Sequence, residues 1–144
     1  MFPSKVSLGN PQVGAGERWS EDGVILAEPN YQDGLKIGLF AYHKAGVLSN
    51  LEAAATQVSG VVLRNLGAPL EDGPVLKTEN TQIANYKRAG LVTVSVKAGA
   101  NPTKFGTVYA EKATGKATAT DTDLETNGEF IEQIDTDVWL IRLI

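Results

Sequence analysis

Short apolar segments bounded by glycine or proline are the feature that most constrains how this chain can fold. From residue 58 onward, β-branched residues recur in runs that turn-forming residues separate. Between Ala89 and Val96 the run alternates, with Leu91, Thr93 and Ser95 facing opposite to Val92, Val94 and Val96, the period of a half-buried strand. Strands spaced about 8–12 residues apart are typical of a sandwich or barrel. We therefore expect an all-β fold, either a small β-barrel or a jelly-roll-like sandwich.

The apolar runs give the expected strands and one helix. The strands are predicted at residues 24–27, 35–42, 58–64, 74–77, 89–96, 106–110, 117–120, 129–131 and 138–144. The last run, Val138 to Ile144, is apolar except for Arg142, and an exposed segment of this kind would aggregate, so we expect it inside a sheet. Residues 49–57 predict a short helix, because Ser49 and Glu52 have capping-box spacing and an alanine run follows.

The first 18 residues differ in character from the rest. Prolines and glycines interrupt Val6 and Leu8 before any strand can lengthen, so residues 1–18 are predicted to be an extended N-terminal arm. Residues 19–144 are predicted to be a single β domain, which suits a chain of 144 residues. The arm is either a loose terminus or is held against a neighbouring molecule. In the second case its apolar side chains and a nearby tryptophan are the candidate interface residues: Phe2, Val6, Leu8 and Trp19.

Composition argues against several classes of partner. The formal net charge is −4 and the 13 Lys and Arg residues are scattered, which disfavours a nucleic-acid partner. The chain has no cysteine, so it forms neither disulfides nor thiolate metal sites. No apolar run approaches the length of about 18 residues that a membrane helix needs, and the start lacks the apolar core of a signal peptide. We expect a soluble protein made in a cytoplasm.

Motifs for catalysis and cofactor binding are missing. The lone histidine, His43, has no partner motif in the sequence and is interpreted as a surface or interface residue. Ser59 does not stand in a G-x-S-x-G elbow. Gly14-Ala15-Gly16 opens a dinucleotide-binding pattern, but Trp19 occupies its third glycine position. Thr114-Gly115-Lys116 reads as a turn. We expect neither an enzyme nor a bound cofactor.

An acidic stretch from Asp121 to Asp137 carries seven carboxylates and no Lys or Arg. Four of its residues follow the spacing of a calcium loop: Asp121, Asp123, Glu125 and Glu132. Thr126 stands where such a loop needs glycine, so a solvated acidic loop is the favoured interpretation. Binding of a cation and contact with a basic patch on a partner both remain open.

The tryptophans allow a second functional class. Trp139 lies in the terminal apolar run and is predicted to be core, whereas Trp19 is the better interface candidate. The alternative to a structural protein is a β-sandwich carbohydrate-binding or fibre module, which would need a row of exposed aromatics beside Asp, Asn or Gln. An enzyme or cofactor-carrier barrel is a third possibility, which no motif in the sequence supports.

Five segments in fixed order resemble the structural cement proteins that decorate the heads of tailed bacteriophages. They are the Val58–Asn65 strand, Tyr86 through Gly99, the Pro102–Tyr109 segment, the Thr114–Ala119 hairpin, and Gly128-Glu129-Phe130. One position departs from the pattern, since Thr107 replaces an aspartate common in that family. The similarity extends from about residue 58 to the end of the chain.

The resemblance implies a non-enzymatic function. A member of this family would bind the outer surface of a phage head, bridge neighbouring major capsid subunits and stabilise the shell. It would assemble as a homodimer or homotrimer, with the major capsid protein as its partner. It would be made in the cytoplasm of the bacterial host and end in the virion.

Overall fold

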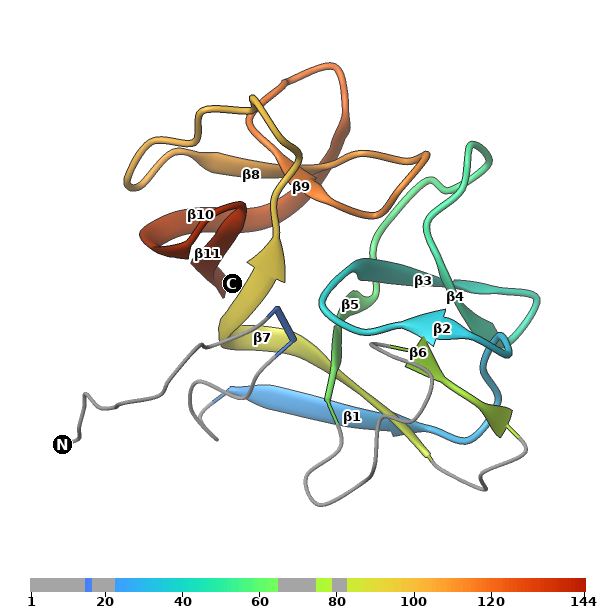
Figure 1. The fold of residues 1–144 in the computed structure, drawn as a ribbon. Helices are drawn as coiled ribbons and strands as arrows, with labels where there is room; N and C mark the ends of the chain where they lie inside the picture. The colour runs from blue at the N-terminus through green and yellow to red at the C-terminus, as the bar shows by residue number, and fades with distance from the viewer. Residues whose placement is uncertain (1–14, 17–22, 65–74, 79–82) are drawn as a thin grey trace, which may run out of the picture.

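The computed structural model describes residues 15–16, 23–64, 75–78 and 83–144, and this part of the chain is built from strands (Figure 1). The strands are β1 (Val24–Glu28), β2 (Leu35–Lys36), β3 (Phe40–Lys44), β4 (Val47–Asn50), β5 (Gly60–Leu63), β6 (Val75–Leu76), β7 (Ala84–Ser95), β8 (Thr107–Ala110), β9 (Ala117–Thr118), β10 (Leu124–Asp135) and β11 (Val138–Leu143). Among the described residues no helix is long and apolar enough to cross a membrane.

The described strands pair antiparallel in one large curled sheet and one small one. The order in the nine-stranded sheet is β4-β3-β5-β7-β11-β10-β8-β9, with β1 also paired to β7, and β2 pairs with β6 separately. In Figure 1 the large sheet bends around itself like half of a barrel. The prediction of an all-β barrel or sandwich is confirmed.

The long strand β7 joins the two halves of the sheet. Its first half, up to Ala89, pairs with β1 and β5, and its second half, from Gly90 to Ser95, pairs with β11. Figure 1 shows the strand changing direction where its partners change. The two halves of the molecule are therefore held together by one continuous backbone.

Two apolar clusters fill the space on either side of β3 and β5. The larger lies between the two halves of the sheet and includes Phe40, Val61 and Phe130, while the smaller lies under β2 and β6 and includes Leu35 and Val62. Since successive side chains of a strand point to opposite faces, Val61 and Val62 enter different clusters. This explains why β5 is an uninterrupted apolar run, the pattern of a strand buried on both faces.

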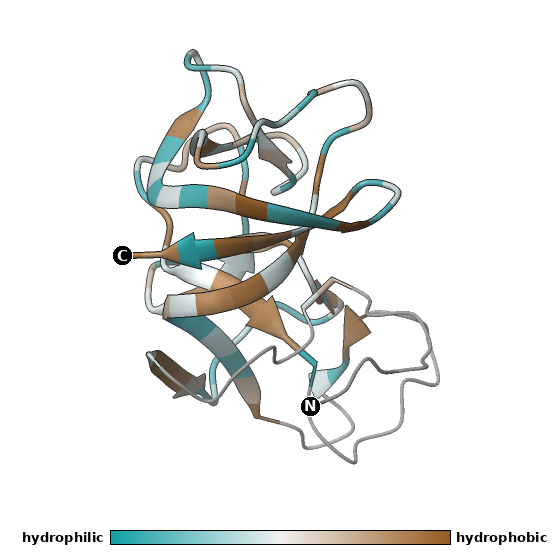
Figure 2. Cartoon of the chain, turned by 90° about the vertical axis from the view of Figure 1, so that its left-hand side faces the viewer, coloured by the Kyte–Doolittle hydropathy of each residue, from teal (hydrophilic) through white to brown (hydrophobic). Residues whose placement is uncertain are grey.

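The apolar run at the end of the sequence lies inside the sheet, as predicted. Strand β11 pairs with β10 on one side and with β7 on the other. Figure 2 shows this strand, next to the C-terminus, as mostly hydrophobic. The last residue, Ile144, extends beyond the ladder and is 82 % exposed.

The predicted helix at residues 49–57 is wrong. Ser49 and Asn50 belong to β4, and a turn follows at Ala53 and Ala54. The Asn50 side chain accepts from the backbone N–H of Lys36 at 2.9 Å and donates to its carbonyl at 3.3 Å. This non-local bonding, together with burial of Leu51 and Ala55 in the core, overrides the local capping pattern.

Two other boundaries also differ from the prediction. The expected strand at 35–42 is divided into β2 and β3, because the chain turns at Ile37-Gly38 and Gly38 donates to the carbonyl of Val62 at 2.9 Å. The strand predicted at residues 129–131 is present but longer than expected, since Leu124–Asp135 form β10 between β8 and β11 and much of the expected acidic loop is strand. Its carboxylates stand on the outer face while Thr126, Gly128 and Phe130 are buried.

Gly16, within the predicted arm, is hydrogen-bonded to the sheet. The N–H of Gly16 donates to the carbonyl of Thr93 at 2.8 Å, and its own carbonyl accepts from Arg64 at 2.9 Å. Gly16 has φ of +80°, and a Cβ there would lie 2.5 Å from Ile37 Cγ2 and 2.8 Å from the carbonyl oxygen of Val62. Only glycine fits this position without movement of the core.

We predict that Gly16→Ala lowers the free energy of unfolding by more than about 1 kcal/mol, because it adds a clash to the strain of a left-handed backbone. Gly46→Ala is the matched control, with φ of +81° and no atom within 4 Å of the added Cβ. Urea unfolding of both variants measures the difference. Equal losses for the two would show that the close packing at Gly16 is unimportant.

Candidate functional site

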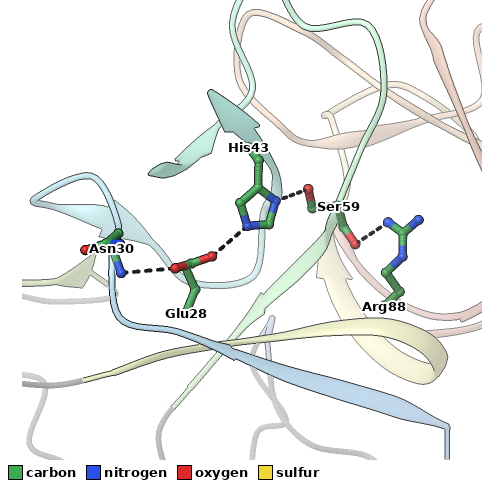
Figure 3. Close-up of polar contacts among 5 residues, drawn as sticks. All are labelled: Glu28, Asn30, His43, Ser59 and Arg88. Atoms are coloured by element: carbon green, nitrogen blue, oxygen red, sulfur yellow. Dashed lines mark hydrogen bonds and ion pairs between the residues drawn. The ribbon is translucent and has the colours of Figure 1, made fainter. Parts of the chain in front are cut away.

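The polar cluster around His43 is the arrangement in the described structure that most resembles a chemical site (Figure 3). The Nε2 atom of His43 lies 2.8 Å from Oε1 of Glu28, and Nδ1 lies 2.7 Å from Oγ of Ser59. A carboxylate only accepts hydrogen bonds, so Nε2 carries the proton in the neutral ring and Nδ1 accepts from the serine hydroxyl. The three side chains form a continuous hydrogen-bonded chain.

Three separate elements bring these residues together. His43 lies on β3, Glu28 ends β1, and Ser59 immediately precedes β5. The backbone N–H of Asn30 donates to the other Glu28 oxygen, Oε2, at 3.2 Å. The His43 side chain is 35 % exposed and that of Glu28 is 18 % exposed, so the cluster is partly shielded from water.

Tyr86 and Arg88 of β7 complete the surroundings. The ring of Tyr86 packs edge-on against the imidazole, with centroids 5.7 Å apart. Burial raises the pKa of the Tyr86 hydroxyl above its usual value, and the negative charge of Glu28 adds to this effect. The Arg88 guanidinium donates to the carbonyls of Val58 and Ser59 at 3.2 and 3.0 Å, which fixes the backbone at the serine.

The order carboxylate, imidazole, hydroxyl is also that of a hydrolytic triad. We therefore compare the surroundings of Ser59 with those that a nucleophilic serine needs. Nucleophilic acyl transfer needs backbone or side-chain donors that stabilise the oxyanion. The N–H of Ser59 instead donates to the carbonyl of Ala41 at 2.8 Å, and Gly60 is held opposite Ala41 in the β3–β5 ladder. The neighbouring cavity of about 180 Å³ is an open hollow between Ser59, Arg88 and Asn127.

What the cluster does in the described structure is to link three separate segments of the chain. It ties the end of β1 to β3 and to the segment that enters β5, and in the described sheet β1 has no backbone ladder with either of these strands. Hydrogen bonds that include a charged group contribute about 1.5–3 kcal/mol when shielded and less at the surface. We call Glu28, His43 and Ser59 the His43 latch.

The predicted site residues fall into two groups. Phe2, Val6, Leu8 and Trp19 all lie outside the described residues, so their interface role stays a prediction. Trp139 is partly buried against the larger core, with its ring edge-on to Phe130 at 5.4 Å, in keeping with its predicted packing role.

The calcium-like spacing does not form a loop. Glu125 and Glu132 stand on the extended strand β10, where seven residues span about 23 Å, too far for both to reach one ion. Asp123 instead accepts a hydrogen bond from Thr118 at 2.7 Å. No group of three or more potential metal ligands occurs in the described part of the chain.

The fold and this latch define an all-β structural module, and comparison with known proteins gives its family. The family model for the XM1 gp53 minor capsid protein matches residues 6–144, so the chain belongs to that family. This membership confirms the resemblance to capsid-associated proteins of tailed phages and indicates a structural role in the capsid. None of the curated proteins matches the chain.

A solved structure agrees with the family assignment. A chain in the structure of the capsid of Myoviridae phage XM1 is 28 % identical and superposes with a TM-score of 0.82. The alignment covers 98 % of this chain and 96 % of that chain. The similarity thus extends over the whole fold, including the N-terminal part where the sequence pattern gave little resemblance.

The sequence did not indicate the latch. Glu28 lies 15 residues before His43 and Ser59 lies 16 residues after it, and neither belongs to a recognisable motif. The one available signal was the position of His43 near the end of a predicted strand, which fixes its face but not its neighbours. The expected exposure of His43 is correct, because the residue remains partly open to solvent.

We predict that His43→Ala lowers the free energy of unfolding by about 1–2 kcal/mol, because it removes both hydrogen bonds of the latch. Lys44→Ala is the matched control on the same strand, and its exposed ion pair with Glu52 should contribute much less. Chemical denaturation followed by circular dichroism gives both values. A loss for His43→Ala no greater than that for Lys44→Ala would contradict the latch.

Proposed function

We propose that this chain is a cement protein of a tailed-phage head. It binds the outer surface of the shell as a homo-oligomer, bridges neighbouring major capsid subunits and makes and breaks no covalent bonds. The observation that carries this proposal is the match of nearly the whole chain to a chain of a phage capsid, together with membership of a minor capsid protein family.

The physical properties of the module suit such a role. A protein that resists outward pressure from packed DNA has to transmit force without unfolding, and the His43 latch and the continuous β7 tie the two halves of the sheet and its edge together. The absence of cysteine makes the module indifferent to redox conditions. A contact burying about 1,600 Å² is modest alone, but its effect multiplies when it is repeated over a lattice.

The N-terminal arm is the proposed grip on the shell, with Phe2, Val6 and Leu8 as its apolar anchors and Trp19, just beyond the arm, as a further contact. The support for this assignment is the attachment of Gly16 to Thr93 and Arg64 at the centre of the sheet. A pull on the preceding residues would reach the core directly instead of fraying the domain. Fourteen residues precede Ala15, and a fully extended segment of that length spans at most about 50 Å, enough to reach a neighbouring subunit.

We predict that adding the purified chain to shells that lack it raises their disruption temperature and their resistance to low salt. Differential scanning calorimetry measures the shift, and electron microscopy shows whether the protein lies on the outer surface. Bovine serum albumin at the same concentration is the control for non-specific protection. Failure to bind, or binding without a rise in disruption temperature, would contradict the cement function.

A second prediction concerns the arm itself. Deleting residues 1–10 should weaken shell binding at least about 10-fold, the loss of roughly one well-packed apolar anchor, and leave the β-sheet spectrum unchanged. A full-length variant with Phe2, Val6 and Leu8 changed to Ser separates the anchoring side chains from chain length. Co-sedimentation with shells measures binding, and unchanged affinity in both variants would show that the arm is passive.

A further inference from the structure

The described part of the nine-stranded sheet ends at three strands, and the fold closes two of these edges. On β4, the N–H of Gln32 donates to the carbonyl of Leu48, and Leu48 donates to Asn30, at 2.8 and 2.9 Å. On β9, Ala117 forms a parallel bridge with Val96 and accepts from Lys97 at 2.9 Å. Among the described residues, no backbone group pairs with the outer edge of β1.

The side chains of β1 do not protect this edge. Natural edge strands carry lysine, proline or an irregularity that prevents pairing with another strand. The sequence of β1 is Val-Ile-Leu-Ala-Glu, and its bulge lies at its start, between Val24 and Ile25, which leaves Ile25 to Glu28 in regular register with β7. Val24 and Leu26 are 44 % and 40 % exposed. Within the described part of the chain this edge is apolar, regular and unpaired, and such an edge is a template for another strand.

We propose that this edge pairs with β1 of a second copy, antiparallel, around a two-fold axis at Leu26. In that register Leu26 lies opposite its own copy, Ile25 lies opposite Ala27, and Glu28 lies opposite Val24. No two carboxylates face one another, so the strand is complementary to itself, as an interface of two-fold symmetry requires. The result is one sheet that continues through two molecules.

The His43 latch favours this pairing. Glu28, the single charge on β1, is already hydrogen-bonded to His43 at 2.8 Å within its own copy, so pairing leaves no carboxylate without a hydrogen-bond donor at the new interface. The latch also fixes the end of β1 before the second copy arrives, which reduces the ordering cost of association. The pairing itself is argued from β1 alone, and only its role on a shell rests on the proposed function. In that role a paired molecule would carry two arms and could reach two capsid subunits.

Because the chain has no cysteine, a single substitution gives a sharp test. Leu26→Cys should form an intermolecular disulfide under mild oxidation, since the two thiols meet at the axis. Val24→Cys is the matched control: the two copies of residue 24 would be separated by four residues, about 13 Å, beyond the reach of a disulfide. Non-reducing electrophoresis should show a dimer for Leu26→Cys and a monomer for Val24→Cys.

Analytical ultracentrifugation of cysteine-free chains tests the same two-fold pairing without cross-linking, because it measures the oligomeric state directly. The unmodified chain should sediment as a dimer, and Leu26→Lys should raise its dissociation constant about 100-fold or more, because two ammonium groups would meet at the axis. The substituted position is exposed in the single copy, so the fold should survive, which circular dichroism checks.

Several results would overturn the pairing. Equal cross-linking of Leu26→Cys and Val24→Cys would mean random collision, and an oligomer that Leu26→Lys leaves intact would mean a different interface.

Other results would assign the edge of β1 to another occupant. A disulfide within one molecule in a Val6→Cys/Leu26→Cys chain would mean that the arm of the same copy covers the edge. A monomeric chain whose shell binding is lost in Leu26→Lys would mean that a capsid subunit covers it. A dimer that fails to bind shells would instead overturn the cement function and leave the pairing intact.

Discussion

The fold depends on strand β7, which belongs to both halves of the large sheet. Residues of β7 before Gly90 complete the half of the sheet that contains β1, β3, β4 and β5, and residues after it complete the half that contains β8 to β11. Within the described sheet the chain passes from one half to the other in β7, and the larger core lies between the two halves. This explains why Val92 and Val94 are fully buried at the point where the two halves meet.

Alternating apolar and polar residues predicted most of the sheet. Successive side chains of a strand point to opposite faces, so burial of one face selects an apolar residue at every second position. The run from Leu91 to Val96 and the apolar run of β11 are of this kind. The failures occurred where a distant residue decides the conformation. Asn50 bonds to Lys36, fourteen residues away, so a local capping pattern became a strand end instead of a helix. The acidic stretch was expected to be loop because its carboxylates conceal the alternating buried positions of β10.

The candidate site was less predictable than the fold for the same reason. A side-chain cluster across three strands depends on register, and register is set by the pairing of whole strands rather than by any short motif. His43 could be placed on a strand from sequence, but its contact with Glu28 required that β1 pair with the first half of β7 while β3 reaches it through β5. The resemblance to capsid-associated proteins of tailed phages, by contrast, came from the order of several segments along the chain. That order can be read from a sequence even where contacts between strands cannot.

The same bonding pattern connects stability to assembly. A module that sits on a shell has to expose some unsatisfied surface to bind, yet it must not polymerise through its sheet edges. Here the chain's own backbone closes the edges at β4 and β9, and the latch holds β1 in place without covering its outer side. Of the edges of the described large sheet, this leaves the one at β1 for a further strand. A rigid body with few open directions adds to a lattice in a defined orientation, and such an orientation is what allows one protein to connect two neighbours rather than coat a surface at random.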